Sequence, residues 1–238
     1  MNSSLNHDRI AEAVALLRDA AATGAAVFST SLSIEDQVLT DLISREAPSI
    51  AIFTIDTGRL PDETYQVLAE TEARYRLRIE VLFPPTEAVE SFVRINGING
   101  FRNSVSQRKH CCEVRKVLPL RRALAGRSAW VTGLRRAQSA TRTDMAARAF
   151  DAQYQLEKFN PLINWSDADI AAYAQTHQLP TNALHAKGYP SIGCAPCSRA
   201  IEPGEDIRAG RWWWESPDSK ECGLHWAGAQ PPSQRTSL

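Results

Sequence analysis

The chain has 238 residues, of which 43% are hydrophobic and 23% charged, a composition typical of a globular protein rather than a disordered one. Lys plus Arg and Asp plus Glu both number 27, and this balance argues against bulk nucleic-acid binding, which requires a basic surface. No apolar run approaches the roughly 20 residues of a membrane span, and no apolar segment follows a basic N-terminus, so we expect a cytoplasmic protein without a signal peptide.

Apolar spacing and turn residues divide the chain into alternating helices and strands. Ser33 with Asp36 resembles a capping box at the start of one helix, and Pro61 starts another. A Gly-, Asn- and Ser-rich stretch over 96–109 is expected to be a loop that precedes a helix containing Cys111 and Cys112. The other expected helices cover 7–22, 33–43, 61–75, 87–95 and 165–177, and the expected strands cover 25–28, 50–55, 79–83, 129–132 and 155–160.

This alternation predicts an α/β fold with a doubly wound parallel sheet. In such sheets ligands bind outside the carboxyl ends of the strands. The polar loops 29–36, 56–60 and 133–139 each follow a strand, so together they could border one nucleotide-sized crevice. Periodicity fades after Thr181, and we expect a main domain over 1–202 and an irregular, mobile C-terminal tail over 203–238.

The loop 29–36 lies between a strand and a helix N-terminus. That arrangement binds phosphate through free backbone N–H groups and the helix dipole. An ordinary capped helix explains the same residues, and this stretch alone does not separate the two interpretations.

Five cysteines form a pair at Cys111 and Cys112, a pair at Cys194 and Cys197, and a single thiol at Cys222. In a cytosolic protein such pairs are more often metal-binding or catalytic than disulfide-linked. The alternatives are small buried side chains, a zinc site and an iron–sulfur cluster. Adjacent cysteines chelate one tetrahedral ion poorly but can reach two irons of a cluster, so the spacing favours the cluster.

The single thiol and several cations complete the set of candidate residues. Cys222 precedes His225 by three residues, and a nearby cation favours the nucleophilic thiolate, although a surplus cysteine in a polar tail is often incidental. Basic pairs at 115–116, 135–136 and 208/211 could form an anion pocket, or could each be a solvated surface charge.

Four motifs in this order resemble the assimilatory adenylyl-sulfate (APS) reductases of the PAPS/APS reductase family. They are Lys109-His110-Cys111-Cys112-Glu113-Val114-Arg115-Lys116, the stretch from Gly188 to Cys197, Arg208-Ala209-Gly210-Arg211-Trp212-Trp213-Trp214, and Glu221-Cys222-Gly223-Leu224-His225. The resemblance covers about residues 25–226. It implies an adenine-nucleotide hydrolase-like fold and the reduction of APS to sulfite and AMP in sulfate assimilation. It also implies thioredoxin, or a glutaredoxin-like protein, as the reductant.

The resemblance also assigns roles to matching residues. Cys222 would attack the sulfur of APS, and the adduct would be an S-sulfocysteine. The cysteines expected to bind one [4Fe–4S] cluster are Cys111, Cys112, Cys194 and Cys197. The expected sulfate and phosphate partners are Lys116, Arg208, Arg211 and His225. The residues expected to cradle adenosine and phosphate are Ser29, Ser31, Ser33, Asp36, Asp56, Thr57 and Gly58, with Arg135 or Arg136 closing over them.

Three other functions compete with this interpretation. An ATP pyrophosphatase-type thiolation enzyme would carry a glycine-rich loop, and residues 29–36 contain no glycine. A PAPS reductase, or an enzyme that accepts both substrates, shares the tail motif but usually lacks both cysteine pairs. A cluster-based redox sensor would need a nucleic-acid-binding module, and none is expected. We expect no membrane partner, and a homo-oligomer is compatible with the sequence.

Overall fold

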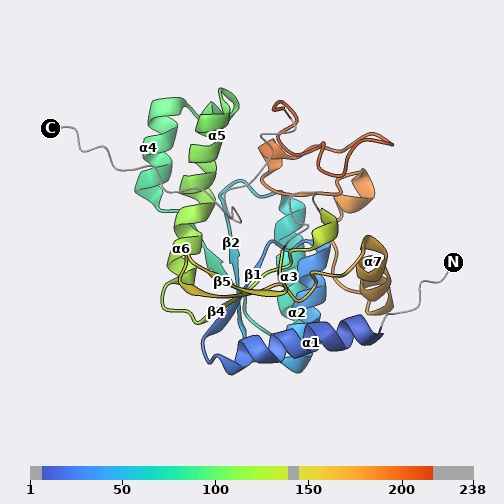
Figure 1. The fold of residues 1–238 in the computed structure, drawn as a ribbon. Coiled ribbons are helices and arrows are strands. Elements are labelled where there is room, and N and C mark those ends of the chain that lie inside the picture. The colour runs from blue at the N-terminus through green and yellow to red at the C-terminus, as the bar shows by residue number, and fades with distance from the viewer. Residues whose placement is uncertain (1–6, 139–144, 217–238) are drawn as a thin grey trace.

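The structure is a computed structural model that describes residues 7–138 and 145–216. Its helices and strands alternate along most of the chain (Figure 1). They are α1 (His7–Ala22), β1 (Ala26–Thr30), α2 (Ile34–Glu46), β2 (Ala51–Ile55), α3 (Asp62–Tyr75), β3 (Glu80–Leu82), α4 (Thr86–Asn96), η1 (Gly100–Arg102), α5 (Val105–Cys112), η2 (Glu113–Val117), α6 (Leu118–Leu124), β4 (Ala129–Val131), η3 (Arg136–Gln138), β5 (Arg148–Asp151), β6 (Leu156–Phe159), α7 (Asp167–Thr176), η5 (His185–Lys187) and η6 (Ala195–Cys197).

The six strands form one sheet in the order β3-β2-β1-β4-β6-β5. Every neighbouring pair is parallel except β5 and β6, which are antiparallel. The predicted α/β class and doubly wound sheet are confirmed. The strand β5 was not expected from the sequence, because it lies at the sheet edge with Phe150 exposed and does not show a buried apolar run.

Alternate side chains of the strands pack into two apolar cores on opposite faces of the sheet. Phe28 packs with residues of α1, α2, α3 and α7, whereas its neighbour Val27 packs with Leu120 and Leu124 of α6. Successive strand side chains point to opposite faces, so this division follows directly from the strand geometry. The helices therefore cover both faces, as a doubly wound fold requires.

The segment expected to be a loop over 96–109 is partly helical. Ser104 caps α5 by accepting a hydrogen bond from the Gln107 backbone N–H at 3.1 Å. The expected helix containing Cys111 and Cys112 is present, but it begins at Val105; its residues are polar and Arg108 is its buried residue, so apolar spacing could not place its start. The π-helical turn η2 follows, because Pro119 lacks the N–H that an α-helix would use there and its ring crowds the preceding turn.

Residues 203–216 belong to the segment expected to be a tail, and in the structure they contact the rest of the chain. Trp212 is buried, and its backbone N–H donates to the Cys197 carbonyl at 3.3 Å. Figure 1 shows this segment, in orange to red, at the same end of the sheet as α4 and α5. Among the described residues, no helix is long and apolar enough to cross a membrane.

Candidate active site

A cavity of about 300 Å³ opens at the carboxyl ends of β1, β2 and β4. Segments 182–193 and 207–212 cover it from the other side. Of the residues predicted to bind substrate, those that line this cavity are Ser29, Ser31, Ser33, Asp36, Thr57, Lys116, Arg135, Arg208 and Arg211. The lining does not include Asp56, Gly58 or Arg136. Cys222 and His225 lie outside the described residues.

The loop after β1 is held by hydrogen bonds to Asp36, a carboxylate in the first turn of α2. The Ser31 backbone N–H and hydroxyl both donate to Asp36 Oδ2 at 2.6 Å, and the Asp36 N–H donates to the Ser33 hydroxyl at 3.4 Å. Burial raises the pKa of Asp36 to about 6, against the hydrogen bonds from Ser31. A Cβ on Gly133 would lie 2.1 Å from Asp36 Oδ1, so glycine is needed for this close approach.

The turn after β2 joins the cavity to the cysteines. Asp56 shapes it by accepting hydrogen bonds from the Gly58 N–H at 2.7 Å and from the Tyr65 hydroxyl at 3.0 Å. The Thr57 hydroxyl lies 3.2 Å from Cys194 Sγ, and the Thr57 carbonyl accepts a hydrogen bond from Arg115 at 2.7 Å. Asp56 and Gly58 therefore position Thr57 rather than line the cavity.

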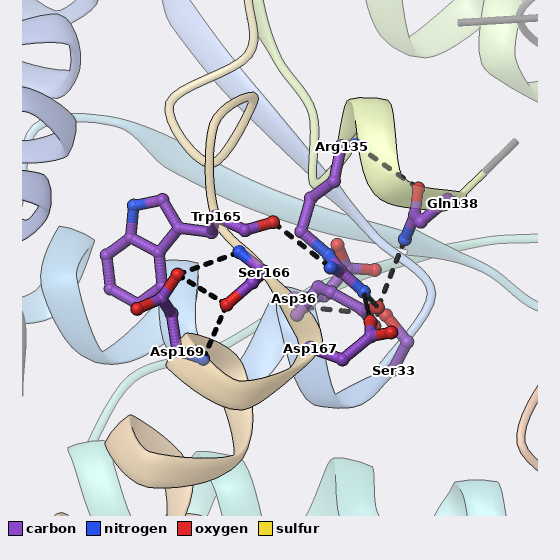
Figure 2. Close-up of polar contacts among 9 residues, drawn as sticks. Ser33, Asp36, Arg135, Gln138, Trp165, Ser166, Asp167 and Asp169 are labelled. Carbon is purple, nitrogen blue, oxygen red and sulfur yellow. Dashed lines mark hydrogen bonds and ion pairs between the residues drawn. The ribbon is translucent and has the colours of Figure 1, made fainter. Parts of the chain in front are cut away.

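Arg135 lines the cavity, but two carboxylates already hold its guanidinium group (Figure 2). Arg135 Nη2 lies 2.7 Å from Glu35 Oε1 and 2.7 Å from Asp167 Oδ1, and Nη1 donates to the Trp165 carbonyl at 3.2 Å. Burial acts to raise the pKa of Glu35, but the hydrogen bond and charge of Arg135 outweigh it and hold that pKa below its usual value.

Arg136 points elsewhere. Its guanidinium group is exposed and donates to the Met145 carbonyl and to Asn164 Oδ1. Of the two arginines predicted to close over the substrate, Arg135 is therefore the one that reaches the cavity. In the structure Arg135 ties the starts of α2 and α7 to the loop after β4, which keeps that cavity wall in place.

The four paired cysteines meet at a second, smaller cavity. Cys111 and Cys112 come from the end of α5, whereas Cys194 directly precedes η6 and Cys197 is its last residue. All four line a space of about 20 Å³, so a group larger than a water molecule would require these side chains to move apart. Within the described residues, no three His, Cys, Asp or Glu side chains form a group suited to one metal ion.

Basic residues surround these thiols. Burial raises the pKa of Cys111 and raises that of Cys197 to about 11, and the neighbouring Cys194 acts in the same direction. Arg115 opposes the shift at Cys111, whereas Lys116 and Arg211 oppose it at Cys197. These cations stabilise the thiolate form, which is the form that binds metals.

Three side chains line both cavities: Lys116, Arg211 and Trp212. Arg211 is buried, its Nε donates to the Cys197 carbonyl at 3.3 Å, and a Cβ on Gly193 would lie 2.2 Å from its Nη2. The Arg211 guanidinium carbon lies 4.9 Å from the centroid of the Trp212 ring. An anion in the larger cavity and the four thiols would thus share one positively charged wall.

Sequence reasoning missed several residues of this site. Glu35 and Asp167 were not singled out, although they are the partners of Arg135. Arg59 and Trp212 also line the cysteine cavity. The Nη1 group of Arg59 and the indole N–H of Trp212 are buried without a hydrogen-bond partner among the described residues. The run of three tryptophans was the signal available for Trp212, whereas no pattern in the sequence distinguished Arg59.

Comparisons with known proteins found one matching family and close relatives. The model of the phosphoadenosine phosphosulfate reductase domain matches residues 25–200. The chain is 56% identical to the adenosine 5'-phosphosulfate reductase of Allochromatium vinosum, over 84% of this chain and 78% of the relative. It is 51% identical to the enzyme of that name from Burkholderia cepacia, over 83% and 79% of the two chains.

Solved structures resemble the fold. The phosphoadenylyl-sulfate (PAPS) reductase of Candida auris, in a phosphate complex, superimposes with a TM-score of 0.67 at 25% identity. The alignment covers 84% of this chain and 100% of that one. The FMN adenylyltransferase of Candida glabrata gives a TM-score of 0.54 at 16% identity, over 87% and 71% of the two chains, which shows likeness of fold alone.

Proposed function

The chain belongs to the phosphoadenosine phosphosulfate reductase domain family, and from this premise we propose that it reduces adenylyl sulfate to sulfite and AMP in sulfate assimilation. Relatives that are about half identical to it bear the name adenosine 5'-phosphosulfate reductase. The observation that carries the proposal is the wall of Lys116, Arg211 and Trp212, which is shared by the nucleotide-sized cavity and the four cysteines.

The chemistry proposed is a transfer of sulfite from AMP to a thiol, followed by reduction. The Cys222 thiolate attacks the sulfur of APS, an S–S bond forms, and the S–O bond to AMP breaks, so that AMP leaves with the electron pair. A thioredoxin dithiol then attacks Sγ of the S-sulfocysteine and releases sulfite. Its second thiol resolves the mixed disulfide and restores Cys222. The dithiol supplies both electrons that reduce the sulfur.

The protein's own residues bind and orient the anion. Lys116, Arg208 and Arg211 line the cavity and would offset the charge of the phosphosulfate and of the departing AMP oxygen. Thr57 and the loop containing Ser31 also line this cavity and would border the adenosine and phosphate. Because AMP is a good leaving group, most of the rate gain is expected from holding a thiolate in line with the S–O bond.

The four cysteines match an iron–sulfur cluster in the chemistry of their donors, and their side chains would have to move apart to admit it. Such a cluster is held by four cysteine thiolates, and four cysteines line this cavity. Arg59, Arg115 and Lys116 would balance the negative charge of a thiolate-ligated group. We propose that Cys111, Cys112, Cys194 and Cys197 hold one [4Fe–4S] cluster, which when bound supplies a metal centre beside the substrate anion.

Protein purified without air is expected to be brown and to contain about four irons per chain. Replacing Cys194 with serine should remove most of that iron, because Cys194 is buried and is one of the four donors. Cys222→Ser is the matched control and should keep its iron. The measurement is iron and zinc content together with sulfite released from APS. A colourless protein with one zinc per chain and full activity would contradict the cluster.

A further inference from the structure

The guanidinium group of Arg59 has one nitrogen that no contact described so far uses. Arg59 lies in the turn after β2, and it lines the cysteine cavity but not the substrate cavity. Its Nη2 donates to the Ile98 carbonyl at 2.7 Å. Its Nη1 is also buried, yet among the described residues it has no hydrogen-bond partner. Buried donors are nearly always paired, and leaving a charged one unpaired is costly, so this N–H requires an acceptor.

Two contacts fix the direction of this guanidinium group. Its carbon lies 5.1 Å from the centroid of the Phe101 ring, and Phe101 is itself buried. The hydrogen bond to Ile98 holds a second point of the same group. Because a guanidinium group is planar and rigid, a contact with the ring and one anchored nitrogen determine where the other nitrogen points. Arg59 Nη1 is therefore held in one place.

The charge of Arg59 acts on the first cysteine pair. Burial raises the pKa of Cys111, and the charges of Arg115 and Arg59 oppose that shift. An arginine keeps its proton in proteins, so Arg59 presents its charge and its N–H donors throughout the physiological pH range. The guanidinium group therefore favours negative charge on sulfur in this cavity.

The backbone of Arg59 is tied to the second cysteine pair. Its carbonyl accepts a hydrogen bond at 2.8 Å from the N–H of Ala195, the residue directly after Cys194. Its own N–H donates to the Thr57 hydroxyl at 3.3 Å, and that hydroxyl lies 3.2 Å from Cys194 Sγ. One residue thus acts on both cysteine-bearing segments, through its side chain at Cys111 and through its main chain at Cys194.

Three kinds of acceptor suit a donor at the wall of the cysteine cavity: a neutral thiol, a water molecule and the sulfur of a metal cluster. A neutral thiol is a weak acceptor. The cavity of about 20 Å³ has room for about one water molecule, which would need about two to four polar partners. Sulfur bound to iron carries negative charge and accepts hydrogen bonds that tune the cluster. The permanent charge of Arg59 favours this third acceptor.

We propose that Arg59 belongs to the cluster site, and that its Nη1 group donates a hydrogen bond to a sulfur atom, either of a cysteine ligand or of the cluster itself. This inference rests on the proposed [4Fe–4S] cluster. Arg59 retains the cluster by offsetting its charge and by holding the Cys194 loop, and it does not line the substrate cavity. Its loss should therefore weaken iron retention without weakening nucleotide binding.

The test uses full-length protein purified without air. Iron release to an excess of ferrous chelator is followed by absorbance, Fe–S stretching frequencies by resonance Raman spectroscopy, and AMP affinity by calorimetry. We expect Arg59→Met to release iron at least ~10-fold faster than wild type, as for the loss of one hydrogen bond to a charged group. Its Fe–S stretching frequencies should rise, because a hydrogen bond to sulfur weakens the iron–sulfur bond. AMP affinity should stay within about twofold.

Arg59→Lys provides a second variant that keeps a positive charge at the cavity wall. One ammonium group then replaces two nitrogens that point to different partners, so we expect iron release at least ~3-fold faster than wild type but slower than in Arg59→Met. Wild-type iron release together with wild-type Fe–S frequencies in either variant would overturn the inference, so the test holds even where Arg59→Met fails to fold.

Arg102→Met is the matched control. The Arg102 guanidinium carbon lies 5.7 Å from the centroid of the same Phe101 ring, and its Nη2 donates to the Pro196 carbonyl at 3.4 Å, but Arg102 does not line the cysteine cavity. This variant should release iron at the wild-type rate. Equal acceleration in Arg102→Met would assign the effect to packing around Phe101 and overturn the inference. Wild-type protein without iron would instead refute the cluster, and with it the acceptor proposed for Arg59.

Discussion

Replacing Cys222 with serine is expected to abolish sulfite production, with at least a ~10,000-fold loss of turnover. A serine hydroxyl without an activating base is a far weaker nucleophile than a thiolate, and it cannot form the S–S bond on which the later attack by a dithiol depends. Because Cys222 is not one of the four cysteines proposed to hold the cluster, the variant should keep its iron and its affinity for APS.

Three measurements on this variant distinguish loss of the nucleophilic thiol from loss of the folded structure. Sulfite release with thioredoxin reports turnover, intact mass after incubation with APS reports the adduct, and calorimetry reports substrate binding. The expected pattern is no sulfite, no adduct and unchanged binding. Turnover at the wild-type rate would show that another group attacks the sulfur.

Removing the charge of Lys116 is expected to cost at least ~100-fold in kcat/KM, or about 2.7 kcal/mol of transition-state stabilisation. Lys116 lines both cavities and acts to lower the pKa of Cys197. Its ammonium group is therefore placed to offset negative charge on the substrate and at the cysteines. Lys116→Ala should fold and assemble a cluster. Lys116→Arg should recover only part of the activity, because a planar guanidinium group does not replace a compact ammonium.

Lys187 offers the control for this substitution. It is 62% exposed, pairs with Glu63 at 2.9 Å and does not line the larger cavity, so Lys187→Ala should leave kcat/KM unchanged. Steady-state kinetics and iron assays on the three variants make the comparison. If kcat/KM of Lys116→Ala falls less than about threefold and its iron content is complete, Lys116 is a solvated helix lysine without a role in the reaction.

The fold and the composition of the cavity were accessible from sequence because both follow local rules. Buried strands followed by polar loops predict where the carboxyl ends of a parallel sheet meet, and Ser31, Thr57 and Arg135 lie there. The cysteine spacing likewise predicted that Cys112 and Cys194 would face a common space. Their roles in binding a substrate or a cluster remain predictions.

The partners of charged side chains were not accessible in this way. Arg135 was expected to close over the substrate, and the sequence did not show that it also pairs with Glu35, which is 100 residues away in sequence. Asp36 was expected to help cradle the adenosine and phosphate, and the sequence did not show that its carboxylate accepts both hydrogen bonds from Ser31. Such pairings depend on how distant segments pack, and neither periodicity nor capping rules carry that information.

The start of the helix that carries Cys111 and Cys112 and the turn at Trp212 were missed for a related reason. The polar helix α5 has no apolar face, and it is held by its Ser104 cap and by the pairing of Arg108 with a residue 107 positions away. The turn at Trp212 depends on contacts with α5 and with Cys197. Residues 203–216 therefore read as a tail in the sequence, although in the structure they form part of the cavity wall.

The ratio of kcat/KM for APS to that for PAPS measures whether this chain is an APS reductase. Anaerobically purified protein is assayed for sulfite with thioredoxin and each nucleotide in turn. We expect a much larger value for APS. Equal values for the two nucleotides, or a preference for PAPS, would show that APS is not the preferred substrate and would overturn the proposed function.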